Sequence, residues 1–150
     1  MSAGQLSVTV VQAEGLHDKD TIGKNDAYVE LYLDKDYKQR TSTKNNSNSP
    51  TWNETFILYV NSFRKIKKLM YSRILIFSNV QAGQHTLHLH VYDDDIGDRD
   101  SIGSVKIDLR PIMEGAAFDQ WVKLPAHFGL GSHGKVRVIM TFTVIWNDSL

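Results

Sequence analysis

The feature that most constrains the fold of this chain is an alternation of apolar and polar residues that recurs in several separate segments. Leu6, Val8 and Val10 are each separated by one other residue, Ser7 or Thr9, and from residue 136 to residue 146 every second side chain is apolar. A period of two is typical of a β-strand with one buried and one solvated face. The sequence therefore predicts an all-β protein built of antiparallel strands.

Clusters of Gly, Asn, Asp, Ser and Pro interrupt the alternating segments and mark turns. Short strands separated by such turns, with little sign of helix, are typical of a β-sandwich. We therefore expect an eight-stranded antiparallel β-sandwich. A chain of 150 residues is long enough to form it as one domain, residues 1–150. The expected strands are 5–13, 27–33, 37–43, 52–60, 85–92, 102–108, 118–123 and 135–146.

Composition argues against several classes of function. The 17 Lys and Arg residues balance 17 Asp and Glu residues, so the chain lacks the basic excess of a nucleic-acid-binding domain. It contains no cysteine, which excludes a disulfide scaffold, a thiolate zinc site and a cysteine nucleophile. No apolar run reaches the about 18 residues of a membrane span, and the first residues lack the pattern of a secretory signal. We therefore expect a soluble cytoplasmic protein that does not bind nucleic acid.

Residues 62–80 break the alternation. This segment carries five of the basic residues and no acidic residue, and its apolar side chains fall near helical spacing. An amphipathic basic helix is one interpretation, and a short extra strand at residues 73–77 is another. A solvated insertion and a sequence artefact such as a translated intron are also open at this point.

Acidic residues gather in two of the predicted turns. Residues 17–26 and 92–103 together contain eight acidic and three basic residues, a local net charge of −5 in a chain that is neutral overall. The eight are Asp18, Asp20, Asp26, Asp93, Asp94, Asp95, Asp98 and Asp100. Each cluster lies beside a predicted strand, so the carboxylates crowd together if both turns lie at the same end of the sandwich.

Crowded carboxylates point to a bound cation. Two like charges about 4 Å apart repel by about 4 kcal/mol at an effective dielectric constant of about 20. Ca²⁺ suits such a site because it takes about 6–8 oxygen ligands from carboxylates, carbonyls and water, more than either turn supplies alone. Asp93 and Asp95 also continue the inward parity of Val91, where an unpaired charge is costly. The alternative is that both clusters are ordinary solvated turns, since aspartate favours turns.

Four motifs, in order along the chain, resemble those of the C2 domain, the calcium-dependent membrane-targeting β-sandwich first defined in protein kinase C. They are LSVTVVQAEGL at 6–16, Asp20 and Asp26 followed by AYV at 27–29, SPTWNETF at 49–56, and Asp93-x-Asp95 with DSIG at 100–103. Ala27 stands where the family usually has proline. The resemblance covers most of the chain and implies a C2-type sandwich. Its opening and final strands match the permuted (type II) strand order, and residues 62–80 are a basic insertion in the family pattern.

The resemblance also implies a ligand set for Ca²⁺. The five calcium-binding aspartates of the family correspond to Asp20, Asp26, Asp93, Asp95 and Asp100. Backbone carbonyls of Lys19 and Asp94 are expected to add ligands, and Asp98 is placed to serve an outer ion.

The function implied is calcium-dependent binding to anionic phospholipid membranes. Ile22 and Ile96 are expected at the loop tips, where they dip into the membrane interface. Lys38, Arg40 and Lys44 lie in the strand region that binds phosphoinositides in many family members. We expect a monomeric signalling or membrane-targeting module that is cytoplasmic and attaches peripherally and reversibly when calcium rises.

Two other classes of function remain as alternatives. The first is a calcium-independent interaction scaffold that uses the same sandwich to bind a protein partner. The second is an enzyme, but the chain has no nucleophilic serine motif, zinc ligand set or phosphate-cradling loop. We therefore expect no catalytic activity.

Overall fold

The computed structural model of the chain describes residues 4–18, 23–60, 85–95, 97–126 and 130–145. Within these residues the chain forms eight strands and one four-residue helix. In chain order they are β1 (Gly4–Glu14), β2 (Ala27–Tyr32), β3 (Gln39–Arg40), β4 (Thr51–Val60), β5 (Thr86–Asp95), β6 (Asp98–Asp108), α1 (Arg110–Met113), β7 (Phe118–Pro125) and β8 (Ser132–Val144).

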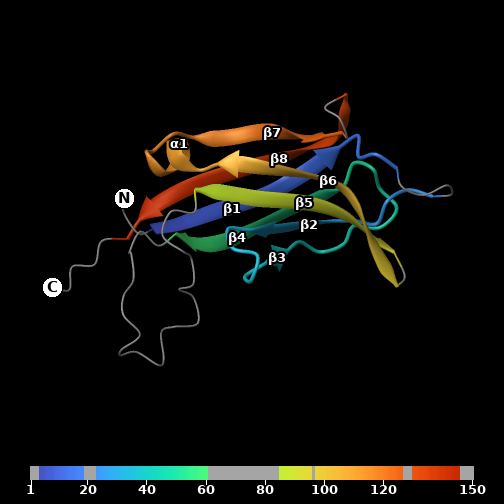
Figure 1. Ribbon diagram of the computed structural model, residues 1–150, viewed down its shortest axis with the longest axis horizontal. Helices are drawn as coiled ribbons and strands as arrows, with labels where there is room; N and C mark the ends of the chain where they lie inside the picture. Colours follow the sequence, from blue (N-terminus) through green and yellow to red (C-terminus); the bar gives the residue numbers. More distant parts are fainter. Residues whose placement is uncertain (1–3, 19–22, 61–84, 96, 127–129, 146–150) are drawn as a thin grey trace.

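The strands form two four-stranded sheets that pack face to face (Figure 1). One sheet has the order β4-β1-β8-β7 and the other has the order β3-β2-β5-β6, and neighbouring strands in both are antiparallel. The expectation of an eight-stranded antiparallel β-sandwich is therefore confirmed. The permuted strand order stays a prediction.

The alternating segments of the sequence form the core between the sheets. The side chains at every second position of β1, β8, β2 and β5 point inward and are almost completely buried: Leu6, Val8, Val10, Val136, Val138, Met140, Val29, Leu31, Leu87, Leu89 and Val91. Burying one such side chain contributes about 1.5–3 kcal/mol. This continuous apolar layer holds the two sheets together and fixes the register of each strand, because a slip of one residue would turn its apolar face outward.

The hairpin of β5 and β6 is longer than the sequence predicts. We expected strands 85–92 and 102–108 with an acidic turn between them, but the two strands stay paired as far as Asp95 opposite Asp98. Gly97 has φ 96°, a left-handed conformation that favours glycine and permits a tight reversal. The second acidic cluster is therefore carried on the end of a two-stranded ribbon, which fixes its backbone more firmly than a loop would.

One further expectation about secondary structure is wrong in detail, and one short helix was not predicted. The predicted strand 37–43 pairs with β2 only at Gln39 and Arg40, because the next ladder position is filled by the Thr41 hydroxyl, which accepts from the N–H of Val29 at 3.0 Å. Helix α1 was not expected from the alternation and occupies the connection between β6 and β7. The segment 62–80 lies outside the described residues, so its interpretations stay open.

Helix α1 has four residues. In the described part of the chain, no helix is long and apolar enough to cross a membrane.

Candidate functional site

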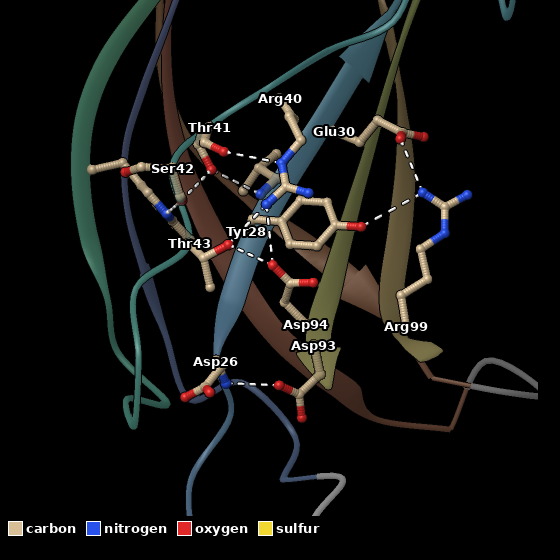
Figure 2. Close-up of polar contacts among 12 residues, drawn as sticks. Asp26, Tyr28, Glu30, Arg40, Thr41, Ser42, Thr43, Asp93, Asp94 and Arg99 are labelled. Atoms are coloured by element: carbon tan, nitrogen blue, oxygen red, sulfur yellow. Dashed lines mark hydrogen bonds and ion pairs between the residues drawn. The ribbon is translucent and has the colours of Figure 1, made fainter. Parts of the chain in front are cut away.

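The two acidic segments meet at one end of the β3-β2-β5-β6 sheet. The start of β2 and the end of β5 are antiparallel neighbours, and Ala27 lies opposite Asp93. The backbone N–H of Asp26 donates to Oδ1 of Asp93 at 2.6 Å (Figure 2). The N–H of Asp94 donates to the carbonyl of Asp26 at 2.9 Å. Residues 67 positions apart in sequence are thus joined directly.

The β5–β6 ribbon brings further carboxylates to this end. Asp93 lies opposite Asp100, and Asp95 lies opposite Asp98, so two like-charged pairs face each other across the ladder. Like charges directly opposite in a sheet are destabilising. Asp93 is completely buried, whereas Asp95 and Asp100 are exposed. The ribbon end is therefore electrostatically unfavourable by itself and is suited to a cation.

The carboxylate of Asp26 is held from the other side of β2. Its Oδ1 accepts from the backbone N–H of Asn46 at 2.6 Å. Asn46 has φ 54°, a left-handed conformation that asparagine tolerates better than most residues. The turn after β3 therefore helps to orient an aspartate that the resemblance assigns to calcium.

Sequence reasoning missed a buried amide that supports the first acidic segment. Asn25 is completely buried, and its Nδ2 donates to Oδ1 of Asn48 at 2.7 Å and to the carbonyl of His17 at 3.0 Å. Its backbone N–H also donates to Asn48 Oδ1. These bonds tie the residue next to Asp26 to two other loops. The only signal in the sequence was asparagine in a turn, and asparagine is common in turns whether or not it is buried.

Asp94 points away from Asp93, toward the outer face of the sheet. Its Oδ2 accepts from the Thr43 hydroxyl at 2.7 Å and from Nη2 of Arg40 at 3.2 Å (Figure 2). These two partners, the Thr43 hydrogen bond first, lower the pKa of the Asp94 carboxyl. The Asp94 carboxylate is thus already bonded to Arg40 and Thr43 of this chain. The resemblance assigns only the backbone carbonyl of Asp94 to the calcium site.

Two of the basic residues expected to contact lipid, Lys38 and Arg40, lie on the same outer face, whereas Lys44 pairs with Ala27, which faces the core. Lys38 Nζ is 2.9 Å from one oxygen of Glu30, and Arg99 Nη1 is 3.2 Å from the other. Burial alone raises the pKa of Glu30, but the bonds and charges of Lys38 and Arg99 together outweigh it and lower that pKa. Arg40 forms an ion pair with Asp94. The backbone of Lys44 pairs with the backbone of Ala27 in an isolated β-bridge. Two of the three predicted lipid-binding cations are therefore already paired with acids of this chain.

The donor chemistry of this end fits Ca²⁺, a hard ion that prefers oxygen ligands. Among the residues that the structure describes, however, no group of three or more His, Asp or Glu side chains is arranged to hold a metal ion. Asp20, Lys19, Ile22 and Ile96 lie outside the described residues, so one of the five expected aspartates cannot be placed relative to the others. The N–H of Asp26 donates to Asp93 and Asp93 lies opposite Asp100, but the described carboxylates do not gather into a group of three.

Comparison with known proteins identifies similarity over most of the chain. The model of the family described as the C2 domain matches residues 4–124. Synaptotagmin-1 of Caenorhabditis elegans is 37% identical over 121 residues, which is 79% of this chain and 24% of that protein. A protein of Arabidopsis thaliana named calcium-dependent lipid-binding protein is 30% identical over 112 residues, which is 75% of this chain and 18% of that protein.

Solved structures agree with the fold. A C2 domain of a plant extended synaptotagmin 1 superposes with a TM-score of 0.70 at 22% identity, and the match covers 97% of this chain and 98% of the solved chain. The chain spans only about a quarter or less of the length of the two curated relatives above. The similarity therefore concerns one module of those longer proteins.

Proposed function

This chain belongs to the C2 domain family, and on that premise we propose that it binds anionic phospholipid membranes in a calcium-dependent manner through the acidic end of its second sheet. The observation that carries the proposal is the hydrogen bond from the N–H of Asp26 to the carboxylate of Asp93. It brings aspartates of two distant segments to one place, which a shared cation site requires.

The residues that would hold Ca²⁺ are Asp20, Asp26, Asp93, Asp95 and Asp100, with Asp98 and the carbonyls of Lys19 and Asp94 as further oxygen donors. The support from geometry is the neighbouring placement of Asp26 and Asp93 and the pairing of Asp93 with Asp100. Bound Ca²⁺ would supply positive charge and open positions for the phosphate oxygens of lipid headgroups.

The remaining steps of membrane binding depend on the side chains of this protein. Without a cation, the net charge of −5 in the two acidic segments repels an anionic membrane. Ile22 and Ile96 would insert into the interface once that repulsion is removed, each contributing up to about 1.5–3 kcal/mol at full burial. Such shallow attachment makes membrane binding peripheral and reversible.

Lys38, Arg40 and Lys44 would provide a second, weaker contact with anionic lipid. The position of Lys38 and Arg40 on one sheet face supports this role for those two residues. Lys38 and Arg40 first have to exchange Glu30 and Asp94 for a lipid phosphate, so their net contribution is small. The five basic residues of segment 62–80 would add about 1 kcal/mol each if they lie near the surface.

In this proposal the chain acts as a single non-catalytic module, residues 1–150, that is monomeric and moves from the cytoplasm to the membrane surface on a rise in calcium. Binding of a protein partner without calcium is the competing function. It uses the same fold and does not require an aspartate of the first acidic segment to lie next to Asp93.

Sedimentation with vesicles tests the proposal. The chain is mixed with phosphatidylcholine vesicles containing phosphatidylserine, with Ca²⁺ or with a chelator. We expect sedimentation with Ca²⁺ only, and its loss in the double variant Asp20→Asn, Asp93→Asn. The double variant Asp108→Asn, Asp119→Asn, which removes the same two charges from ion pairs outside the acidic end, is the matched control and should sediment normally. Sedimentation of the double variant that responds to Ca²⁺ as fully as that of the unaltered chain would refute the proposal.

A further inference from the structure

Two oppositely charged side chains join the acidic end to the outer face of the sheet. Arg40 lies at the end of β3, and Asp94 lies between the proposed calcium ligands Asp93 and Asp95 on β5. Figure 2 shows the two side chains meeting beside the ring of Tyr28 on β2. β3 and β5 are not neighbouring strands, because β2 lies between them in the sheet.

The guanidinium of Arg40 is held on several sides. It lies 3.6 Å from the centroid of the Tyr28 ring, and its Nη2 donates to the Thr43 hydroxyl at 2.8 Å and to Oδ2 of Asp94 at 3.2 Å. The same hydroxyl donates to Asp94 Oδ2 at 2.7 Å. Arg40, Thr43 and Asp94 thus form a closed triangle of hydrogen bonds, which we call the Arg40 clamp.

The clamp stands on a fixed support. Thr41 is buried and exchanges two bonds with Val29, one from its backbone N–H and one to its hydroxyl. Lys44 and Ala27 exchange two backbone bonds, at 2.9 and 3.0 Å. The segment that carries Arg40 and Thr43 is therefore anchored to β2 at both ends, so it gives the clamp a fixed support from which to hold the Asp94 side chain.

Restraint of Asp94 also restrains its neighbours. Successive side chains of a strand point to opposite faces, so a fixed outward direction for Asp94 sets the opposite direction for Asp93 and Asp95. The backbone N–H of Asp94 donates to the carbonyl of Asp26, and the N–H of Asp26 donates to the carboxylate of Asp93. Without such a restraint, mutual repulsion of the ribbon-end carboxylates would favour their moving apart.

We propose that Arg40, through Thr43 and Asp94, is a positioning residue for the calcium site: it preorganises the β5 end so that Asp93 and Asp95 are aimed at the ion before it binds. The inference rests on the proposed function, because it concerns calcium affinity. Removing a group that orients a metal ligand typically weakens metal binding about tenfold or more. Arg40 is thereby given a role in the calcium site in addition to a contact with lipid.

The direction of the change in Ca²⁺ affinity when Arg40 is replaced distinguishes a positioning role from a purely electrostatic one. Arg40 is a cation close to the proposed site, so loss of its charge alone would strengthen Ca²⁺ binding. If Arg40 acts as a clamp, its loss weakens Ca²⁺ binding despite the more negative local charge. Thr43→Val removes one hydroxyl with no change of charge and no change of side-chain shape, so it tests the same contact independently.

The experiment measures Ca²⁺ affinity by calorimetry for the full chain and for Arg40→Gln and Thr43→Val. Amide hydrogen exchange at Asp94 and Asp26, followed by NMR in calcium-free buffer, reports the position of the strand end without the ion. The controls are Arg137→Gln, which breaks the Arg137–Asp119 pair of the other sheet, and Thr55→Val, which breaks the Thr9–Thr55 hydroxyl pair.

We expect Arg40→Gln to weaken Ca²⁺ binding about tenfold and Thr43→Val to weaken it by a smaller factor, with faster exchange of both amides in each. The controls should match the unaltered chain. If the unaltered chain binds Ca²⁺ and Arg40→Gln binds it equally or more tightly, the inference is overturned and the proposed function stands. If the unaltered chain binds no Ca²⁺, the proposed function fails and the inference falls with it.

Discussion

The backbone N–H of Asp26 donates to the buried carboxylate of Asp93 at 2.6 Å. The burial of Asp93 increases the cost of losing this hydrogen bond. This single contact fixes the start of β2 against the end of β5. The proposed calcium site therefore depends on a bond that belongs to the fold itself.

Substitutions of Asp93 should separate its structural role from its proposed metal role. Asp93→Asn keeps an oxygen that accepts from Asp26, so we expect the calcium-free melting temperature to stay within about 2–4 °C of the unaltered chain. Asp93→Leu leaves the Asp26 N–H without its acceptor and should cost about 1–3 kcal/mol. Thermal denaturation in a chelator measures both. Equal melting temperatures for the two variants would show that the bond contributes nothing.

Asn25 should matter more for stability than its place in a turn suggests. Asn25→Ala removes two side-chain hydrogen bonds and leaves the carbonyl of His17 and the amide oxygen of Asn48 with fewer donors. We expect a loss of about 2–3 kcal/mol, read by urea denaturation. Asn45→Ala, in the neighbouring turn, is a useful comparison because Asn45 is exposed and does not have a positive φ. A loss below about 0.5 kcal/mol for Asn25→Ala would mean that its buried hydrogen bonds do not support the first acidic segment.

Glu30 should give the chain a pH-dependent part of its stability. Its pKa lies below the ordinary value of 4.5, so the carboxylate stabilises the fold above pH 4.5, and this stabilisation is lost as the pH falls through the lowered pKa. Glu30→Gln has no such carboxylate. We expect its melting temperature to lie below that of the unaltered chain at about pH 6 and the difference to shrink toward about pH 3. A difference that stays constant over this range would exclude the ion pairs as its source.

The same residue should limit membrane binding without calcium. Glu30 holds Lys38 and Arg99, which lie over the rings of Tyr32 and Tyr92. Glu30→Gln releases both cations, and each is worth about 1 kcal/mol, or about fivefold, near an anionic surface. We therefore expect at least about fivefold stronger binding to phosphatidylserine vesicles in a chelator.

The control for this experiment is Glu54→Gln. It makes the same change in net charge, but Glu54 binds the hydroxyl and the N–H of Ser42 and holds no cation of the sheet face among the described residues. A similar gain in both variants would assign the effect to net charge instead of to the release of Lys38 and Arg99.

The sheets were predictable from the sequence because burial leaves a period of two. Leu6, Val8 and Val10 show it plainly, and the structure buries all three. The short β3 and the long β5–β6 ribbon were not predictable in the same way. They depend on whether one ladder position is filled by the Thr41 side chain and on a reversal at Gly97, which are local choices that polarity does not encode.

The charges of the site were predictable only as a cluster. Crowding of aspartates in two segments indicates a cation site, and the structure brings Asp26 and Asp93 together. The pairing of Arg40 with Asp94 and of Glu30 with Lys38 and Arg99 could not be predicted, since each partner is distant in sequence or belongs to another strand. Alternation indicates which side chains of a strand share a face, but it gives no information on which charges meet there.

Two separate segments should share one calcium site, and a calcium titration of the melting temperature tests this most directly. One variant from each segment is compared, Asp26→Asn and Asp93→Asn, together with the double variant. Ca²⁺ at about a hundredfold excess over its Kd should stabilise the unaltered chain by about 2.7 kcal/mol, a rise of about 5–10 °C. We predict that each single variant loses most of this rise and that the double variant loses little more, because both residues serve one site. A full rise in Asp26→Asn together with its loss in Asp93→Asn would contradict a site shared between the two segments.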